Sequence, residues 1–141
     1  MDNELIDLLR TVASGFQGRM QEQVAASGSG LTTFQARLIN IVGRNEGISQ
    51  LSLGSFVDRD KAQIARAVKE LEARGLVTRG PHASDWRAKS LALTREGKRI
   101  HASLSALRQQ LAADVLAQFS QEEKQGFRAH LQKMEAALRK E

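Results

Sequence analysis

The segment "DKAQIARAVKELEARG", residues 60–75, constrains the fold more than any other part of the chain. Its apolar positions recur at helical spacing and share one face: Ile64, Ala67, Val68 and Leu71. This period predicts a helix with one buried side and one polar side. Asp60 or Asp58 can cap its start, and Gly75 can end it in a left-handed conformation. The helix is therefore bounded on both sides, and its neighbours must pack against the apolar face.

A shorter helix and a tight turn precede this helix, and a hairpin follows it. In "GISQLSLGSFVDRD", residues 47–60, Ser49 is a candidate N-cap, and the expected apolar contacts are Leu53, Phe56 and Val57. Residues 76–79 predict a short strand, and Leu91 and Leu93, alternating with Ser90 and Ala92, predict the returning strand. Two helices joined by a tight turn form a helix-turn-helix, and a hairpin directly after them is a wing.

The N-terminal part is helical by period. Residues 3–26 carry a stripe at steps of three and four, namely Leu5, Leu8, Leu9, Val12, Phe16, Met20 and Val24. Residues 27–30, "SGSG", interrupt it. Thr32 and Gln35 form a capping box for a second helix, whose expected buried stripe is Phe34, Leu38, Ile41 and Val42. Two helices therefore precede the helix-turn-helix.

The C-terminal part is also helical. Thr94 caps a long helix with the stripe Ile100, Leu104, Leu107, Leu111, Val115 and Phe119. Ser120 and Glu123 form a second capping box, which starts a last helix. That helix is expected to turn four side chains inward: Phe127, Leu131, Met134 and Leu138. The expected fold class is mainly α, a winged helix-turn-helix with a small β-hairpin wing between flanking helices.

The composition narrows the class of protein. A chain of 141 residues corresponds to one domain, or one domain with helical extensions. It has no cysteine, which excludes disulfides, thiolate metal sites and thiol redox switches. No apolar run approaches the roughly 18 residues that span a membrane. The acidic, charge-interrupted start "MDNELIDLLR" is unlike a signal peptide. We therefore expect a soluble cytoplasmic protein that does not contact a membrane.

Positive charge gathers in the middle of the chain. Residues 59–99 contain eleven Lys and Arg against five Asp and Glu, whereas the whole chain has a net charge of +5. The flanks are therefore close to neutral. A local basic region favours a polyanion site, although a solvated charged face has the same composition.

The polar face of the helix at 60–75 has side chains suited to a DNA major groove. These are Ala62, Gln63, Arg66 and Lys69, with Lys61 at the start of the helix. Gln can pair with adenine and Arg with guanine, and a small alanine permits close approach. The alternative is an ordinary surface helix with solubilising charges. The attached hairpin favours the DNA-binding interpretation. Ser49 and Gln50, at the start of the shorter helix, are candidates for contacts to the DNA backbone.

The hairpin tip holds the only proline and the only tryptophan, Pro81 and Trp86. Arg87 is the candidate for the minor groove, whose negative potential attracts a weakly hydrated cation. Asp85 can pair with Arg87 and hold it in place. Further wing contacts to DNA are expected from His82, Trp86 and Lys89, although the sequence favours packing of Trp86 against the hairpin over a DNA contact.

These motifs together resemble the MarR family of bacterial winged-helix transcription factors. "DKAQIARAVKELEARGLVTR" is similar to the family's recognition helix, and "SDWRAKSLALTREG" to its wing signature Asp-x-Arg followed by Leu-x-Leu-Thr-x-x-Gly. The resemblance implies a homodimer joined through its N- and C-terminal helices, which binds a pseudo-palindromic operator, commonly as a repressor. The implied domains are 1–30 for N-terminal dimerisation, 31–99 for DNA binding and 100–141 for C-terminal dimerisation. Apolar stripes on the outer helices fit dimerisation, although an intramolecular core could use them too.

The resemblance also implies release of DNA by a small aromatic or phenolic effector, with no cofactor. The candidate pocket residues are Phe16, Arg19, Phe34 and His101, of which the two phenylalanines also suit a plain core. The alternative function is a winged-helix module that binds protein, RNA or DNA without sequence preference. An enzyme has little support, because no nucleophile with a matching base, phosphate-binding loop or metal-ligand cluster is evident. We therefore assign no catalytic and no metal-binding residue.

Overall fold

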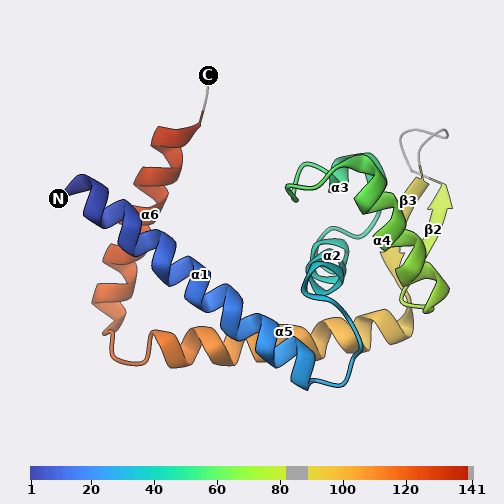
Figure 1. The fold of residues 1–141 in the computed structure, drawn as a ribbon, viewed down its shortest axis with the longest axis horizontal. Helices are drawn as coiled ribbons and strands as arrows, with labels where there is room; N and C mark the ends of the chain where they lie inside the picture. Colours follow the sequence, from blue (N-terminus) through green and yellow to red (C-terminus); the bar gives the residue numbers. More distant parts are fainter. Residues whose placement is uncertain (82–88, 140–141) are drawn as a thin grey trace. The chain divides into compact units, whose positions relative to one another are not determined.

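The computed structural model describes residues 1–81 and 89–139 and contains two compact units, Met1–Arg108 and Gln109–Glu141 (Figure 1). The first unit contains the helices α1 (Asp2–Ala26), α2 (Thr33–Arg44), α3 (Gln50–Leu53) and α4 (Lys61–Ala73). It also contains the strands β1 (Ile48–Ser49), β2 (Val77–Pro81) and β3 (Lys89–Leu93). Helix α5 (Arg95–Val115) starts in the first unit and ends in the second, which also contains α6 (Gln121–Leu138).

The predicted helix starts are confirmed by their hydrogen bonds. The Thr32 hydroxyl accepts from the Gln35 backbone N–H at 3.1 Å, and the Gln35 side chain accepts from the Thr32 N–H at 3.0 Å. Ser120 and Glu123 make the same reciprocal pair before α6. Such boxes satisfy two backbone donors that a helix leaves unpaired at its start. Short local motifs therefore determine where these helices begin.

The wing is an antiparallel hairpin, as predicted, with Val77 opposite Leu93 and Pro81 opposite Lys89. The sheet also contains a third strand, which the sequence did not indicate. Strand β1 pairs with β3, with Ile48 opposite Leu91, and the sheet order is β1-β3-β2. A strand of two residues has no measurable period, so only its partner reveals it. Pro81 is tolerated because β2 is an edge strand.

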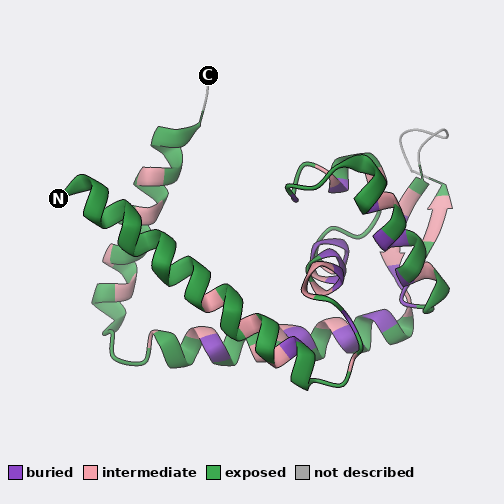
Figure 2. Cartoon of the chain, viewed as in Figure 1, coloured by how far each residue is buried: buried purple, intermediate pink, exposed green. Residues whose placement is uncertain are grey.

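The core of the first unit is built around α2, α4 and the sheet. Its fully buried side chains include Leu38, Ile39, Leu53, Leu71 and Leu91. The predicted apolar face of α4 is buried throughout, and Figure 2 shows its purple inner side against a green outer side. Phe56 departs from the prediction, because it lies beyond the end of α3 and its side chain is 46% exposed. Phe34 is only partly buried against the core.

For α5 and α6, one prediction is confirmed and two are wrong. The Thr94 hydroxyl accepts from the Gly97 N–H at 3.0 Å, as expected of a cap. The stripe predicted for α5 runs too far, because the helix ends at Val115 and Phe119 lies outside it, 45% exposed. The expected inward stripe of α6 is also wrong for a single chain, because no residue of α6 is buried. A helical period identifies an apolar face but not the element that covers it.

Helix α1 also leaves its apolar side chains largely exposed in the single chain. Only Val24 is buried along its 25 residues, and Figure 2 draws most of its length in green. The exposed large side chains on α1 are Leu5, Ile6, Leu8, Leu9 and Val12. In the parts of the chain that the structure describes, no helix has the length and hydropathy needed to cross a membrane.

Gly97 explains one position of the wing signature in physical terms. A Cβ atom added to Gly97 would lie 2.1 Å from the Leu76 carbonyl oxygen, which accepts from the Thr94 N–H at 3.0 Å. The first turn of α5 therefore lies directly against the backbone before β2, and only glycine leaves room for that approach.

We predict that Gly97→Ala lowers the free energy of unfolding by about 2–3 kcal/mol, because backbone must move to accept the methyl group. Gly126→Ala in α6 is the matched control, since a Cβ there meets nothing within 4 Å. It should raise the stability by about 0.5–1 kcal/mol through helix propensity. Urea denaturation at one protein concentration measures both, and equal effects would contradict the proposed close approach.

Candidate nucleic-acid interface and the adjoining cavity

Helix α4 presents the predicted DNA-binding residues on one exposed face. The Asp60 carboxylate accepts from the Gln63 backbone N–H at 2.8 Å, so Asp60 rather than Asp58 is the N-cap. Ile64, Ala67, Val68 and Leu71 are buried, whereas the following five are exposed: Lys61, Ala62, Gln63, Arg66 and Lys69. The predicted division of the helix into a core face and an outer face is therefore confirmed. The contacts of the outer face with DNA remain a prediction.

Polar contacts fix α4 against its neighbours. The Gln35 side chain, only 8% exposed, donates to the Glu70 carboxylate at 2.8 Å. Arg79 of β2 pairs with Glu72 at 2.5 Å. A part-buried, hydrogen-bonded pair of this kind positions elements better than an exposed one. These contacts engage two acidic side chains of α4.

Arg74 adds a further tether at the end of α4. Its guanidinium donates to the Gly30 carbonyl at 3.2 Å and to the Ser29 carbonyl. The predicted stop is confirmed, because Gly75 has a φ of 73°. The loop between α1 and α2 is thereby joined to the last turn of α4.

Two side chains of α2 contact the turn between α3 and α4. The Arg37 guanidinium donates to the Phe56 carbonyl oxygen at 2.9 Å. The Arg59 guanidinium lies over the Phe34 ring, 4.6 Å from its centroid, at the distance of a cation–π contact. Both contacts fall just before the Asp60 cap, so they restrain the turn that leads into α4.

The structure describes only some of the other residues that are predicted to contact DNA. Lys89 is exposed at the start of β3, while His82, Asp85, Trp86 and Arg87 lie outside the described residues. Ser49 is the N-cap of α3, as predicted, and its hydroxyl accepts from the Ser52 N–H at 3.0 Å. Gln50 begins α3 and is half-buried, and its side-chain oxygen has no hydrogen-bond partner among the described residues.

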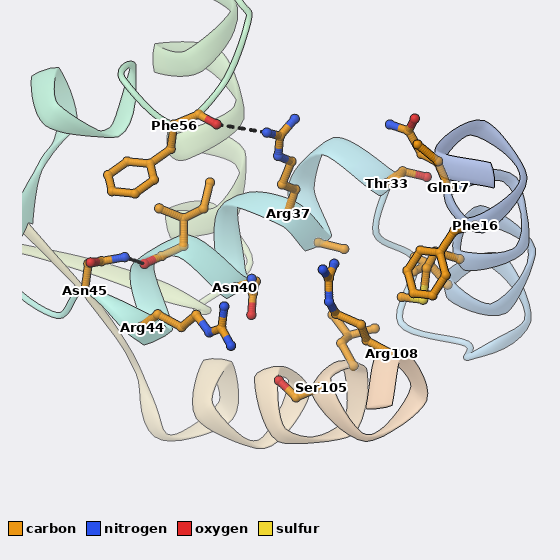
Figure 3. A pocket seen from close by; sticks show the side chains of 16 residues that line it. Phe16, Gln17, Thr33, Arg37, Asn40, Arg44, Asn45, Phe56, Ser105 and Arg108 are labelled. Atoms are coloured by element: carbon orange, nitrogen blue, oxygen red, sulfur yellow. Dashed lines mark hydrogen bonds between the residues drawn. The ribbon is translucent and has the colours of Figure 1, made fainter. Parts of the chain in front are cut away.

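A cavity of about 710 Å³ lies in the first unit between α1, α2 and α5. Its apolar lining includes Phe16, Met20, Val24, Ile41 and Leu104, with Phe56 from the turn before α4. Figure 3 shows Arg44 directed toward Asn40, Arg37 directed toward Phe56, and Arg108 extending from α5 toward α2. A volume of this size is typical of small-molecule sites.

Of the four pocket residues predicted from the sequence, the structure places only Phe16 in the lining. Arg19 lies on the surface of α1, where its Nε is 4.0 Å from Oε2 of Glu22. Phe34 lies under Arg59. His101 packs over Gly43, and its Nε2 is 3.2 Å from the Asn40 side-chain oxygen. His101 therefore reaches the cavity only through Asn40.

Sequence reasoning missed the three arginines of the lining, Arg37, Arg44 and Arg108. Each lies at a polar position of an amphipathic helix, where a solvated charge is the ordinary interpretation. Their shared location depends on how α2 and α5 pack, which no spacing within one helix reveals. One signal was available, because Arg37 and Arg44 lie seven residues apart, on the same face of α2.

This architecture defines a winged helix-turn-helix protein with an exposed polar recognition helix. A sequence model of the MarR family matches residues 29–88. The transcriptional regulator HosA of Escherichia coli O127:H6 is 30% identical over 104 residues, which cover 74% of this chain and 77% of HosA. The chain belongs to the MarR family of transcriptional regulators. Membership confirms the expected family and the expectation of a regulator rather than an enzyme.

Solved structures agree on the fold. A putative MarR-family regulator from Listeria monocytogenes, complexed with 26mer DNA, matches with a TM-score of 0.81 at 20% identity. The match covers 94% of this chain and 87% of that one. The MepR–DNA complex of S. aureus matches with a TM-score of 0.78 at 19% identity, covering 94% of both chains.

We predict that Asp60→Ala lowers the free energy of unfolding by about 1 kcal/mol, because the Gln63 N–H loses its acceptor. Asp58→Ala removes the same charge two residues earlier and should change stability by less than half as much. Urea denaturation of the two variants compares them directly. An equal loss in both would mean that local charge, rather than the cap, stabilises the start of α4.

Proposed function

We propose that the chain is a homodimeric repressor that binds a pseudo-palindromic operator in double-stranded DNA through α4 and the wing. The observation that carries the proposal is the exposed face of α4, which combines Gln63 and Arg66 with small and basic neighbours. Two solved structures of the same fold contain DNA, which supports this use of the fold. We place the regulator in the cytoplasm, where its operator is accessible.

The charge on this surface favours a polyanion. Lys61, Arg66 and Lys69 are exposed on α4, and Lys89 is exposed on the wing. Meanwhile the Glu70 and Glu72 carboxylates are engaged by Gln35 and Arg79. The N-terminal end of α4 adds the positive end of its helix dipole. Phosphate contacts of this kind supply affinity and make binding strongly salt-dependent.

Sequence discrimination needs contacts to base edges as well as to phosphate. Gln63 and Arg66 lie one helical turn apart, in the N-terminal half of α4. Their amide and guanidinium groups can pair bidentately with adenine and guanine in the major groove. Ala62 lets the helix approach closely. We therefore assign base contacts to Gln63 and Arg66, and backbone contacts to the lysines.

Dimerisation accounts for the exposed apolar faces of the outer helices. Leu8 and Val12 of α1 are 54% and 57% exposed, and Phe127 of α6 is 47% exposed. Large apolar surfaces of this kind in a folded chain usually mark an interface. A two-fold dimer would repeat the recognition helix and so require a palindromic site.

We also propose that a small aromatic or phenolic effector occupies the cavity and releases the operator. The cavity combines an apolar wall with polar groups from α2 and α5, as ligand sites do. No cofactor is part of the proposal.

The operator is found by selecting bound duplexes from a random DNA library at two salt concentrations. Enrichment of a pseudo-palindrome is the expected result. Salt-sensitive binding without an enriched motif would instead favour a winged-helix module for non-specific DNA, RNA or protein.

On the selected operator, Arg66→Ala and Gln63→Ala should each weaken binding by about 1–3 kcal/mol, because one base contact is lost. Arg87→Ala, in the wing, should also weaken it. Fluorescence anisotropy measures the affinities, and circular dichroism checks the fold. Arg19→Gln is the control, because it removes a charge from α1, outside the proposed DNA-binding surface. Unchanged operator affinity in the α4 variants would show that the outer face of α4 does not contact the bases.

A second prediction concerns assembly. Combining Leu8→Glu with Val12→Glu should convert the dimer to monomer, because charges cannot be buried unpaired in an apolar interface. Leu51→Glu alters a leucine on α3 that is even more exposed, at 75%, and should leave the dimer intact. Analytical ultracentrifugation distinguishes the two states. A double variant that stays dimeric would exclude this face of α1 from the interface.

A further inference from the structure

One side chain joins the loop between α1 and α2 to the last turn of α4. The Arg74 guanidinium donates to the Gly30 carbonyl oxygen at 3.2 Å and also to the Ser29 carbonyl oxygen. In the described part of the chain, no other hydrogen bond joins this loop to α4, and no ion pair involves Arg74. A planar guanidinium that donates to two successive carbonyls fixes direction as well as distance, which the point charge of a lysine does not. Arg74 therefore holds the loop in one orientation relative to α4.

The loop is stiffened by hydrogen bonds of its own. The Ser27 hydroxyl donates to the Val24 carbonyl oxygen at 2.6 Å and accepts from the Ser29 backbone N–H at 3.3 Å. The Ser29 hydroxyl in turn accepts from the Leu31 N–H at 3.3 Å. Val24 and Leu31, at the two ends of this segment, are buried in the core. Local bonds of this kind restrict the backbone, so the contact made by Arg74 reaches the end of α1.

Apolar packing holds α1 only weakly to the rest of the first unit. Val24 is the only buried residue of this helix, all of which the structure describes. A cavity of about 710 Å³ lies between α1, α2 and α5. Side chains that line a void lose the contacts that close packing would supply. The direction of α1 therefore depends on the polar contact of Arg74 more than it would in a close-packed pair of helices.

The direction of α1 matters because this helix carries part of the proposed dimer interface, at Leu8 and Val12. The helix is continuous, and the stretch from Val12 to Ser27 corresponds to about 22 Å at 1.5 Å per residue. Over that length, a change of about 10° in direction displaces the far end by about 4 Å, more than the rise of about 3.4 Å of one base pair. The angle between α1 and α4 therefore determines how far apart the two recognition helices of a dimer lie.

We propose that Arg74 determines the half-site spacing that the dimer accepts. By joining α4 to the end of α1, Arg74 fixes the separation of the two recognition helices, and an operator whose half-sites lie at that separation binds best. Arg74 is a positioning residue that contacts neither bases nor phosphates. The inference rests on the proposed dimeric, operator-binding function, and it deepens that function by assigning selectivity for spacing to a residue that is not among the proposed base contacts.

The spacing is tested on the selected operator and on versions with one base pair added or removed between the half-sites. For the wild type, either change should weaken binding by at least about tenfold, because both helices cannot then reach their half-sites together. Arg74→Gln should bind the parent operator more weakly, yet lose less than about threefold on either change, because its recognition helices are less constrained. The penalty for a wrong base within a half-site should stay at the wild-type value.

The matched control is Arg99→Gln. Arg99 and Arg74 line the same small cavity of about 330 Å³, but Arg99 pairs with Glu96 and does not contact the loop. The control removes the same charge from the same place, so it should keep the wild-type discrimination between spacings.

Two further variants address the geometry of the contact. Arg74→Lys keeps the charge but loses the two-point contact, so it should relax the spacing as Arg74→Gln does. Gly30→Ala alters the loop instead, because Gly30 has a φ of 71° and an added Cβ would lie 3.5 Å from Nη2 of Arg74. It should relax the spacing as well. Arg74→Gln should keep the wild-type slope of log affinity against log salt, whereas a lost phosphate contact lowers that slope by about 1.

A measurement without DNA tests the separation of the helices directly. The chain has no cysteine, so Ala62→Cys places a single spin label at an exposed position of each α4 in a dimer. Double electron–electron resonance then measures the distance between the two labels. With Arg74 present the distance distribution should be narrow. Adding Arg74→Gln should broaden it, and adding Arg99→Gln should leave it unchanged.

Wild-type discrimination between spacings in Arg74→Gln, an unchanged distance distribution, or a lowered salt slope would each overturn the inference. Equal effects of Arg99→Gln would also overturn it, because charge rather than the contact with the loop would then set the spacing. A wild type that selects no palindrome would refute the proposed function, whereas a distance distribution that broadens in Arg74→Gln would still support the positioning role.

Discussion

Burial of the apolar face of α4 is the constraint on which the rest of the structure depends. Ile64, Ala67, Val68 and Leu71 pack into the core, which forces Gln63 and Arg66 to the outside. At about 25 cal/mol per Å² of apolar surface, burial of such side chains outweighs the small helix propensities of this segment. The same packing that stabilises the domain therefore presents the surface proposed to read DNA.

Hydrogen bonds and an ion pair fix the position of α4 relative to its neighbours. Gln35 holds Glu70, Arg79 holds Glu72, and the Arg37–Phe56 contact restrains the turn before Asp60. Each is modest in energy, but together they link α2 and β2 to one helix. A regulator needs such a set, because a ligand can change DNA affinity only through contacts that differ between two states. Of these contacts, the one made by Arg37 also reaches the cavity.

Local sequence signals predicted most of the fold. The capping boxes of Thr32 and Ser120, the stop at Gly75 and the apolar period of α4 depend on residues within one turn of each other, and all are confirmed. The failures involve distant partners. Strand β1 exists only because β3 lies beside it, and no residue of α6 is buried in the single chain. The outer face of α4 followed from its period, whereas the cavity arginines depend on how separate helices pack.

The central claim is that the outer face of α4 reads bases rather than only attracting phosphate. Repeating the random-duplex selection with Arg66→Ala tests it most directly. The account predicts that the enriched motif loses preference at one base pair in each half-site, at symmetric positions, while the other positions are retained. An unchanged motif with uniformly weaker binding would contradict it, because Arg66 would then contact only the DNA backbone.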